Sequence, residues 1–446
     1  MAKRFIPKLS VILCIAAVIL SGVTVRTQAA SRDSIDEMIA SIPSDWPEAP
    51  NVQVGAAILM DADSGEILYA KNATEAMYPA STTKLMTALL TLEYASLQDV
   101  VSFSQKAVMI PSGSSHIGMR RGEKMVLREC LYGLLLPSAN EVANALAEHV
   151  AGAIAPFISL MNERAYQLGA VNTVFTNTNG LHDEGHYTCA YDLALIMQAL
   201  STNNTFLEIS SAQSYVHHAD ELLPKDIPMT NTNMMIRRSS EYYNETVVCG
   251  KTGHTSESGY NLVTYAENDG TRLIVVVMGC ESGMQYVATQ SLLDYGFHYF
   301  HQVLPAELDT SLNMENRFTA SPLSIPTGEV TLLSVNSGDT ILLPDNVTFD
   351  QLDKEIHPAE DGILILYKYQ DYPLGSVFLS YTAEKELPIV LPKDTSERTA
   401  RSEPKNLVII DGFLVVFLIA LSGLITGLIL FLRNRFRPKN TFRWIK

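Results

Sequence analysis

Cysteine is scarce in this sequence: five occur among 446 residues, at irregular spacing and without a C-x-x-C pair. A chain of this length can bury an ample core without disulfides. The cysteines that follow the N-terminal segment are therefore predicted to be buried thiols, although an exported chain could oxidise a pair of them. They are Cys130, Cys189, Cys249 and Cys280.

A metal site is equally hard to assemble from the sequence. His182 and His186 are four residues apart, but Gly180 and Gly185 make that stretch a loop. No set of cysteines or carboxylates completes a zinc site around the two histidines. We therefore expect neither a metal nor another cofactor.

Positive charge is in short supply as well. The formal net charge is −16, and the basic excess is concentrated in the first 30 and the last 14 residues, which contain no acidic residue. The region between them is therefore more acidic than the whole chain, which argues against nucleic acid as a partner. An anionic substrate would have to be held by local cations.

The N-terminal segment is predicted to be a secretory signal peptide. Residues 1–30 begin with basic residues, continue through an apolar run from Leu9 to Val23, and end in the small pair Ala29 and Ala30. The mature chain is expected to begin near Ser31.

The C-terminal end is predicted to anchor the protein in a membrane. Phe413 to Leu432 contains no charged residue and would be about 30 Å long as a helix, enough to span a bilayer. The basic tail, 433–446, is expected to stay in the cytoplasm, with the bulk of the protein on the extracytoplasmic side of the cell membrane. Gly423 and Gly427 form a G-x-x-x-G pair, a possible face for a homodimer.

Between these ends we predict two domains. A region of strands, then helices, then strands indicates an α/β or α+β domain whose sheet is shared by both ends of the segment. Helical periodicity is weak in the region after it, which favours a small all-β domain. The predicted divisions are a signal peptide (1–30), a linker (31–45), a large α/β or α+β domain (46–303), a β-rich domain (304–391), a linker (392–406), a transmembrane helix (407–432) and a tail (433–446).

Periodicity and turn residues place the individual elements. Strands are expected at 52–60, 66–70, 246–251, 260–265 and 273–278, and helices at 82–95, 126–137, 141–150, 157–168, 190–200 and 294–300. In the β-rich region, 331–335 and 340–343 flank the turn residues Asn336 to Asp339, and 363–369 and 376–381 flank a second turn.

The first chemical signal is the S-x-x-K pair of Ser81 and Lys84 in the stretch YPASTTKLMTALL. Apolar side chains cover nearly every side of the helix that follows, so the helix is predicted to be buried, and a spacing of three places both residues on one face. Burial favours a neutral amine that can take the proton of the hydroxyl. Because Ser402 and Lys405 repeat the pair in a polar linker, the pair alone is weak evidence.

Two further elements could complete a cleft. Ser138 and Asn140 place a hydroxyl and an amide two residues apart, where the hydroxyl could relay a proton and the amide could orient an acyl group. The alternative is that either residue caps the next helix. Lys251, Thr252 and Gly253 place a cation, a hydroxyl and a bare backbone on an edge strand, where they could form a cradle for a carboxylate. The alternative is an ordinary salt-bridged lysine beside a turn.

Taken together, the three elements resemble the penicillin-recognising serine enzymes. The stretches YPASTTKLMTALL, LLLPSANEVANALAEHVAG, GLHDEGHYTCAYDLA, KTGHT and LLDYGF are similar to the low-molecular-mass penicillin-binding proteins that are serine D-alanyl-D-alanine carboxypeptidases. The resemblance covers about residues 45 to 300 and implies a penicillin-binding or β-lactamase-like transpeptidase fold. The implied partners are peptidoglycan stem peptides as substrate and β-lactams as covalent inhibitors.

The resemblance also implies a role for each site residue. Ser81 would form the acyl-enzyme, Lys84 would be the general base and Ser138 would take part in proton transfer. Asn140, Lys251, Thr252 and Gly253 would bind substrate, Lys251 and Thr252 at its terminal carboxylate. The backbone amides of Ser81 and His254 would form the oxyanion hole. Cys249 before the K-T-G element and the absence of a basic residue in Glu281 to Gln285 depart from the family pattern.

Two other functions remain open at this point. A β-lactamase would share the acylation step but would need a carboxylate to activate the deacylating water, and no such element is evident in the sequence. A catalytically inactive wall-binding or scaffold protein could keep the fold without the chemistry.

Overall fold

The computed structural model describes residues 32–309, 312, 331–335, 340–359 and 362–383. The predicted signal peptide, the second linker, the transmembrane helix and the basic tail all lie outside the described residues. The chain divides into two units, Met1–Lys385 and Glu386–Lys446, and every described residue belongs to the first. Within the described part, no single helix is long and apolar enough to cross a membrane. Two consecutive helices, Asn140–Ala151 and Ile154–Gln167, reach that length together but are bent by 86°.

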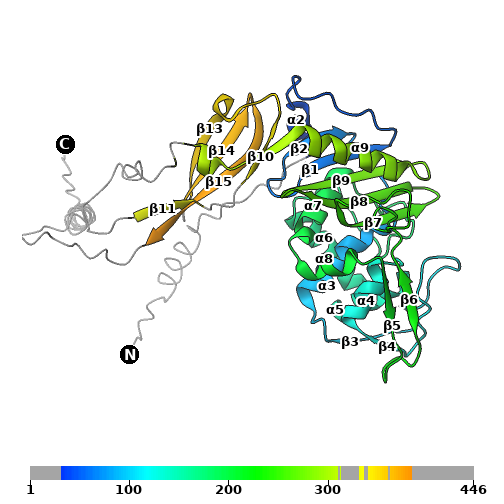
Figure 1. The fold of residues 1–446 in the computed structure, drawn as a ribbon. Helices are drawn as coiled ribbons and strands as arrows, with labels where there is room; N and C mark the ends of the chain where they lie inside the picture. The colour runs from blue at the N-terminus through cyan, green and yellow to red at the C-terminus, as the bar shows by residue number, and fades with distance from the viewer. Residues whose placement is uncertain (1–31, 310–311, 313–330, 336–339, 360–361, 384–446) are drawn as a thin grey trace, which may run out of the picture. The chain divides into compact units, whose positions relative to one another are not determined.

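A five-stranded antiparallel sheet forms the centre of the catalytic region, in the order β2-β1-β9-β8-β7 (Figure 1). Its strands come from both ends of the region, as the sequence predicts, and the expected hairpins β1–β2 and β8–β9 are confirmed. The edge position predicted for the strand of Lys251 is also confirmed, because β7 pairs only with β8 in this sheet. The strands are β1 (Ala56–Asp61), β2 (Ile67–Lys71), β7 (Val247–Thr255), β8 (Gly259–Asn268) and β9 (Thr271–Cys280).

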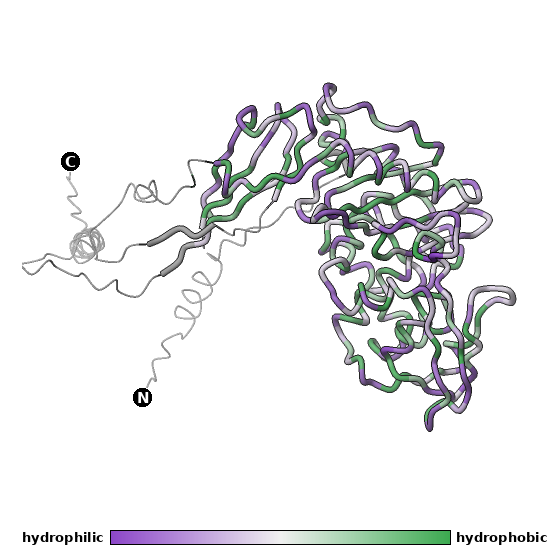
Figure 2. The backbone as a smooth tube through the Cα atoms, viewed as in Figure 1, coloured by the Kyte–Doolittle hydropathy of each residue, from purple (hydrophilic) through white to green (hydrophobic). Residues whose placement is uncertain are grey.

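Helices cover both faces of this sheet (Figure 1). Alternate residues of β1 face opposite sides: Ile58 and Met60 join the core under the large helical layer, and Ala57 and Leu59 join the core under α9 (Met284–Tyr299). Figure 2 shows hydrophobic segments along the strands and the helices that pack on them. The large layer contains α3 (Lys84–Tyr94), α4 (Leu127–Leu135), α5 (Asn140–Ala151), α6 (Ile154–Gln167), α7 (Ala190–Ser201) and α8 (Asn204–Ser210).

Several elements differ from the sequence predictions. The predicted linker at 31–45 contains a helix, α2 (Arg32–Ala40), whose Ile35 is buried. Helix α9 begins at Met284, ten residues before the predicted start at Asp294, because its first turns bury polar residues and so lack an apolar period. Helix α8 and two short hairpins are not predicted. Their strands are β3 (Val100–Ser102), β4 (Lys124–Val126), β5 (Ser214–His217) and β6 (Ile227–Thr230).

The β-rich region contains a four-stranded sheet in the order β11-β15-β14-β13. The predicted strands on either side of Asn336 to Asp339 are present but do not pair with each other, because β11 pairs with β15 and β12 pairs with β10. The predicted strands around the second turn are present and pair with each other, as β14 and β15. The remaining elements are β10 (Phe300–Val303), α10 (Pro305–Leu308), β11 (Thr331–Val335), β12 (Ile341–Pro344), η4 (Phe349–Gln351), β13 (Asp353–Ala359), β14 (Gly362–Tyr369) and β15 (Tyr372–Ala383). That this region is a separate all-β domain stays a prediction.

Candidate active site

Ser81 lies in a short 3₁₀ turn, η1 (Ala80–Thr83), that leads directly into α3. The residue before it, Ala80, has φ = +50°, a conformation that costs a non-glycine residue roughly 1–3 kcal/mol. Thr83 Oγ1 donates to the Ala80 carbonyl at 2.8 Å. Gly180 packs against the same carbonyl, where a Cβ would lie 1.7 Å from the Ala80 oxygen. The surrounding structure therefore fixes the backbone on which Ser81 is presented.

Lys84 is fully buried, and its amine has three oxygen neighbours. Nζ lies 2.9 Å from Ser81 Oγ, 2.7 Å from Asn140 Oδ1 and 2.6 Å from the Asn179 carbonyl oxygen. The oxygens of Asn140 and Asn179 can only accept, so they take two N–H groups of the amine. In the neutral amine, the remaining lone pair faces the hydroxyl of Ser81. The predicted juxtaposition of Ser81 and Lys84 is confirmed.

The electrostatics of the site favour that neutral amine. Burial lowers the pKa of Lys84 well below its ordinary value of 10.5, the nearby cation of Lys251 lowers it further, and Glu141 opposes the shift. Burial also lowers the pKa of Lys251, to about 7. Both lysines are therefore buried, and the cation of Lys251 makes the ammonium form of Lys84 less stable.

Ser138 and Asn140 lie between α4 and α5 and face this region. Ser138 has φ = +65°, and its buried Oγ has no hydrogen-bond partner among the described residues. Asn140 is the first residue of α5 and is buried against Lys84. The helix-cap alternative is wrong, because the N-cap residue is Ala139 and no side chain caps the helix.

Lys251, Thr252 and Gly253 lie on β7, where the strand runs past the turn of Ser81. Lys251 is buried, and its Nζ donates to the carbonyl of Thr252 at 3.0 Å. Thr252 faces the cleft, with its Oγ1 2.7 Å from Oγ1 of Thr232. A Cβ on Gly253 would lie 3.2 Å from the Ser81 nitrogen, so glycine permits the strand to approach the nucleophile.

A cavity of about 510 Å³ opens above these residues. Five of the residues that the sequence analysis assigned to the site line this cavity: Ser81, Ser138, Thr252, Gly253 and His254. The amine groups of Lys84 and Lys251 lie behind its wall, where they act on the lining groups. The cavity is also lined by residues to which the sequence analysis gave no individual role, and these include Ser115, Thr232, Tyr242, Asn261, Gln285 and Tyr286.

Asn261 shows why such residues escape sequence reasoning. Its Nδ2 donates to the carbonyls of Tyr78 and Pro79 at 2.9 and 3.0 Å, which ties β8 to the segment before the nucleophile. No local pattern around Asn261 indicates this contact, because its partners lie more than 180 residues earlier in the chain.

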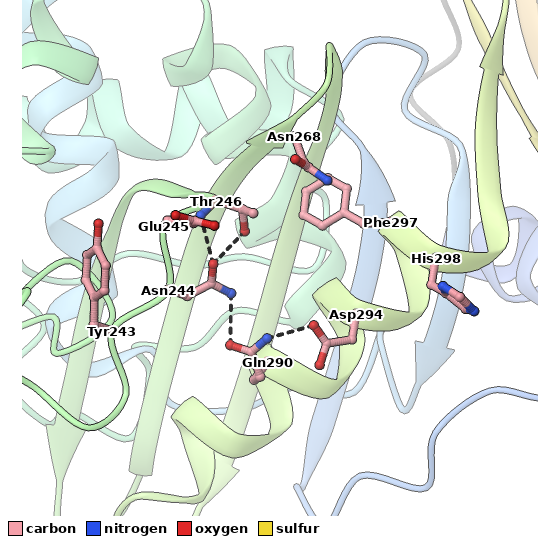
Figure 3. A pocket seen from close by; sticks show the side chains of 9 residues that line it. All are labelled: Tyr243, Asn244, Glu245, Thr246, Asn268, Gln290, Asp294, Phe297 and His298. Atoms are coloured by element: carbon pink, nitrogen blue, oxygen red, sulfur yellow. Dashed lines mark hydrogen bonds between the residues drawn. The ribbon is translucent and has the colours of Figure 1, made fainter.

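A larger cavity, of about 720 Å³, lies between α9, the segment 243–246 that precedes β7 and the end of β8 at Asn268, and none of the predicted site residues lines it (Figure 3). Its polar wall is a chain of amides and a carboxylate: Asn244 donates to Gln290 at 2.8 Å, and Gln290 donates to Asp294 at 2.7 Å. Because these groups already satisfy one another and none is a nucleophile beside a base, we place the chemistry in the smaller cavity.

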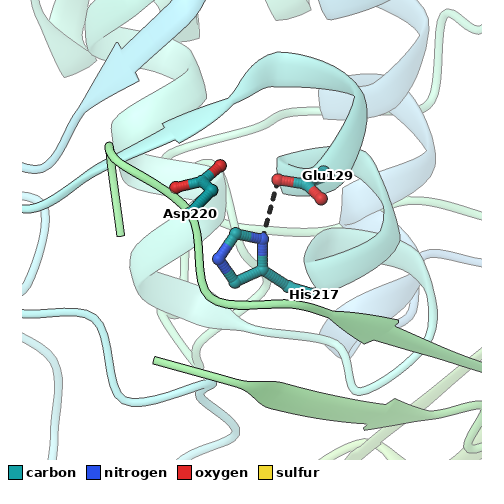
Figure 4. A group of neighbouring side chains, drawn as sticks. All are labelled: Glu129, His217 and Asp220. Carbon is teal, nitrogen blue, oxygen red and sulfur yellow. Dashed lines mark hydrogen bonds and ion pairs between the residues drawn. The ribbon is translucent and has the colours of Figure 1, made fainter. Parts of the chain in front are cut away.

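One group of side chains in the described residues has metal-ligand spacing: Glu129, His217 and Asp220, with ligand atoms within 4.8 Å of one another (Figure 4). These three side chains already form hydrogen bonds with other protein groups. His217 Nδ1 lies 2.8 Å from Glu129 and Nε2 lies 3.3 Å from the Leu223 carbonyl, while Asp220 accepts two backbone N–H groups. The expectation of no metal stays a prediction.

The other histidines and the cysteines have structural positions. His186 is buried, accepts the Thr176 N–H at Nδ1 and therefore donates from Nε2 to Thr83, the residue that holds the Ala80 carbonyl. His182 packs edge-on against Tyr78. The predicted buried thiols are confirmed: the four described cysteines are free and buried, with Cys249 lying on β7 just before Lys251.

Comparison with known proteins places this geometry in context. Residues 44–282 match the model of the Peptidase_S11 family, described as D-alanyl-D-alanine carboxypeptidase. The chain is 29% identical over 349 residues to the D-alanyl-D-alanine carboxypeptidase DacF of Bacillus subtilis, covering 76% of this chain and 85% of that protein. It is 34% identical over 274 residues to DacC of Escherichia coli, a D-alanyl-D-alanine carboxypeptidase, covering 59% and 66% of the two chains.

Solved structures show the same architecture. The crystal structure of penicillin binding protein 6B from Escherichia coli has a TM-score of 0.57 and 25% identity, covering 76% of this chain and 98% of that one. Penicillin binding protein 5 from Haemophilus influenzae also has a TM-score of 0.57, with 24% identity, and supports the fold alone.

Proposed function

Since this chain belongs to the peptidase S11 family of D-alanyl-D-alanine carboxypeptidases, we propose that it removes the terminal D-alanine from peptidoglycan stem pentapeptides through an acyl-enzyme on Ser81. The observation that carries this proposal is the 2.9 Å separation of Ser81 Oγ from Lys84 Nζ. The other two neighbours of the amine are obligate acceptors, so a neutral Lys84 can only receive a proton from the serine.

Acylation begins when Ser81 Oγ attacks the carbonyl carbon of the penultimate D-alanine and its proton passes to Lys84 Nζ. Backbone amides of Ser81 and His254 stabilise the developing oxyanion. The C–N bond then breaks, and the leaving amine of the terminal D-alanine receives a proton through Ser138 Oγ. Water hydrolyses the ester, releases the shortened peptide and regenerates Ser81.

The terminal carboxylate of the substrate binds beside β7. Thr252 and Thr232 present two hydroxyls to the cavity at the same point, and the cation of Lys251 lies directly behind them. Gly253 lets the peptide lie along the strand, and Asn140 orients both the acyl group and Lys84. Because Glu281 to Gln285 contains no basic residue, binding of the carboxylate depends on Lys251.

Penicillins acylate the same serine, since their strained amide offers the same carbonyl to Ser81. Of the described residues that line the cavity, Glu241 is the one carboxylate, and it is not among the hydrogen-bond partners that the described residues give Ser81 and Lys84. The penicilloyl ester should therefore persist. Rapid turnover of penicillin by the purified protein would favour a β-lactamase instead.

The location of the enzyme belongs to this proposal. A signal peptide at 1–30 and a transmembrane helix within 407–432 would place the catalytic domain on the outer face of the cell membrane, where its substrate lies, with residues 433–446 in the cytoplasm. Pairing through Gly423 and Gly427 would make a homodimer. Protease added to intact spheroplasts should remove the catalytic domain, and its protection would refute this topology.

The decisive test of function uses the purified full-length protein and its Ser81→Ala variant. The natural protein should release D-alanine from a stem pentapeptide and should retain labelled penicillin on the peptide that contains Ser81. The variant should do neither. Release that survives the substitution would refute the mechanism, and a natural protein that binds no penicillin would favour an inactive scaffold.

A further inference from the structure

Glu141 is a buried carboxylate directly after Asn140, in the first turn of α5. It is 1% exposed. Its Oε1 accepts backbone N–H groups from Ile117, Gly118 and Met119, at 2.8, 3.1 and 3.4 Å. Three donors on one oxygen make a charge-assisted anchor for a segment that has neither helix nor strand of its own.

The anchored segment reaches the catalytic cavity. Ser115, two residues before the anchor, lines the cavity together with Ser81 and Ser138. The backbone N–H of Asn140 donates to the Ser115 carbonyl at 2.9 Å. Asn140 therefore holds the loop at its contact with the cavity, and Glu141 holds it directly after that contact. The same Asn140 binds Lys84.

Glu141 also contributes to the electrostatics around Lys84. Two charged groups act on Lys84, Lys251 on β7 and Glu141 on α5, and Lys84 in turn acts on His186, which lies before α7. Glu141 is the one acid among these described residues. Its Oε2 is buried and has no hydrogen-bond partner in the described part of the chain, so no donor on that side offsets its charge.

We propose that Glu141 is a positioning residue of the active site, which holds the Ser115 loop at the cavity and stabilises the ammonium that Lys84 becomes when it takes the proton of Ser81. The need for such a group follows from the proposed acyl-enzyme mechanism, on which this inference rests. The proton reaches Lys84 in a dry site beside the cation of Lys251, where a new positive charge is costly. A fixed negative charge on the residue next to Asn140, which itself binds Lys84, reduces that cost at the moment when it arises.

Two substitutions separate the two roles. Glu141→Gln keeps the size and one acceptor oxygen but removes the charge. It should lower the maximal rate of Ser81 acylation about tenfold. It should also move the acidic limb of the pH–rate profile about one unit lower, because the ammonium of Lys84 becomes less stable. Glu141→Asp keeps the charge but shortens the side chain, so it should leave the acidic limb in place and raise KM through the displaced loop.

The experiment measures D-alanine release from a pentapeptide, and acylation by labelled penicillin, between pH 5 and pH 10 for the full-length natural protein and each variant. Glu148→Gln, two turns further along α5, is the matched control and should change neither quantity. An acidic limb that moves to lower pH in Glu141→Gln, but in neither Glu141→Asp nor Glu148→Gln, supports the proposal. An unchanged limb in Glu141→Gln leaves a structural role only and overturns it.

The outcomes also distinguish this inference from the proposed function. If the natural protein releases no D-alanine, the proposed function fails first. If the natural protein is active and Glu141→Gln matches it at every pH, the function stands and the inference fails. If thermal unfolding shows that Glu141→Gln does not fold, the charge-conserving Glu141→Asp variant decides. A shifted acidic limb of its pH–rate profile overturns the electrostatic role. An acidic limb in its natural place, together with a raised KM, supports the proposal.

Discussion

Replacement of Lys84 by methionine should separate the chemistry of the site from its fold. Lys84→Met keeps the length and most of the volume of the side chain but removes the nitrogen that lies 2.9 Å from Ser81 Oγ. A positioned general base contributes roughly 10²- to 10⁴-fold to such a step. This corresponds to about 3–5 kcal/mol of transition-state stabilisation, so the acylation rate should fall by that range.

The same substitution has a smaller effect on stability. Asn140 Oδ1 and the Asn179 carbonyl lose the donor that each binds at 2.7 and 2.6 Å. A buried acceptor left without a partner costs about 1–3 kcal/mol. The variant no longer buries an amine, which offsets part of this cost. We therefore expect a net loss of about 1–3 kcal/mol, a fraction of the stability of a domain of this size.

The assay is the rate of Ser81 acylation by labelled penicillin, measured together with urea unfolding of the same samples. Lys106→Met is the matched control, because Lys106 is exposed and does not line the cavity, and it should match the natural protein in both measurements. A folded Lys84→Met variant that acylates within tenfold of the natural rate would refute the role given to this amine.

Three further predictions follow from the geometry. Gly180→Ala should abolish acylation, because the added Cβ would strike the carbonyl of Ala80, the residue before the nucleophile. Gly113→Ala is the control and should remain active, because Gly113 also has a positive φ but has open space around it. Equal activity of the two variants would contradict this prediction. Asn140→Asp should place a carboxylate on Lys84, raise the pKa of that lysine and move the acidic limb of activity to higher pH; a limb that stays in place would count against it. Burial lowers the pKa of His186 to about 4 from 6.5, so the unfolded chain takes up a proton in that window while the native chain does not. Stability should therefore fall by about 3 kcal/mol as the pH drops from 6.5 to 4, and His186→Gln should remove that part of the slope in urea unfolding.

Local sequence patterns were sufficient for the parts of the site that depend on neighbouring residues. Ser81 and Lys84 are one helical turn apart, so their contact follows from spacing, and the burial of their helix follows from its apolar residues. The start of α5 and the edge strand of Lys251 follow from similar local patterns.

Contacts between distant segments were not predictable in this way. The Asn179 carbonyl that binds Lys84 is a backbone atom of a loop, and any residue type could supply it. Gly180 is required only because the turn of Ala80 packs against it. Glu141 carries the Ser115 loop through three backbone N–H groups, which leave no pattern in the sequence. The early start of α9 at Met284 was missed because Gln285 is a polar residue that the fold buries.

The central claim is that Lys84 is a neutral base at the pH at which the enzyme works. The most direct test is the rate constant for acylation of Ser81 by labelled penicillin as a function of pH. Because burial and Lys251 both lower the pKa of Lys84, the rate should rise with pH and reach its plateau well below pH 10.5, the ordinary pKa of a lysine. A rate that keeps rising about tenfold per pH unit up to pH 10.5 would contradict the account, because the amine would then be an ordinary ammonium.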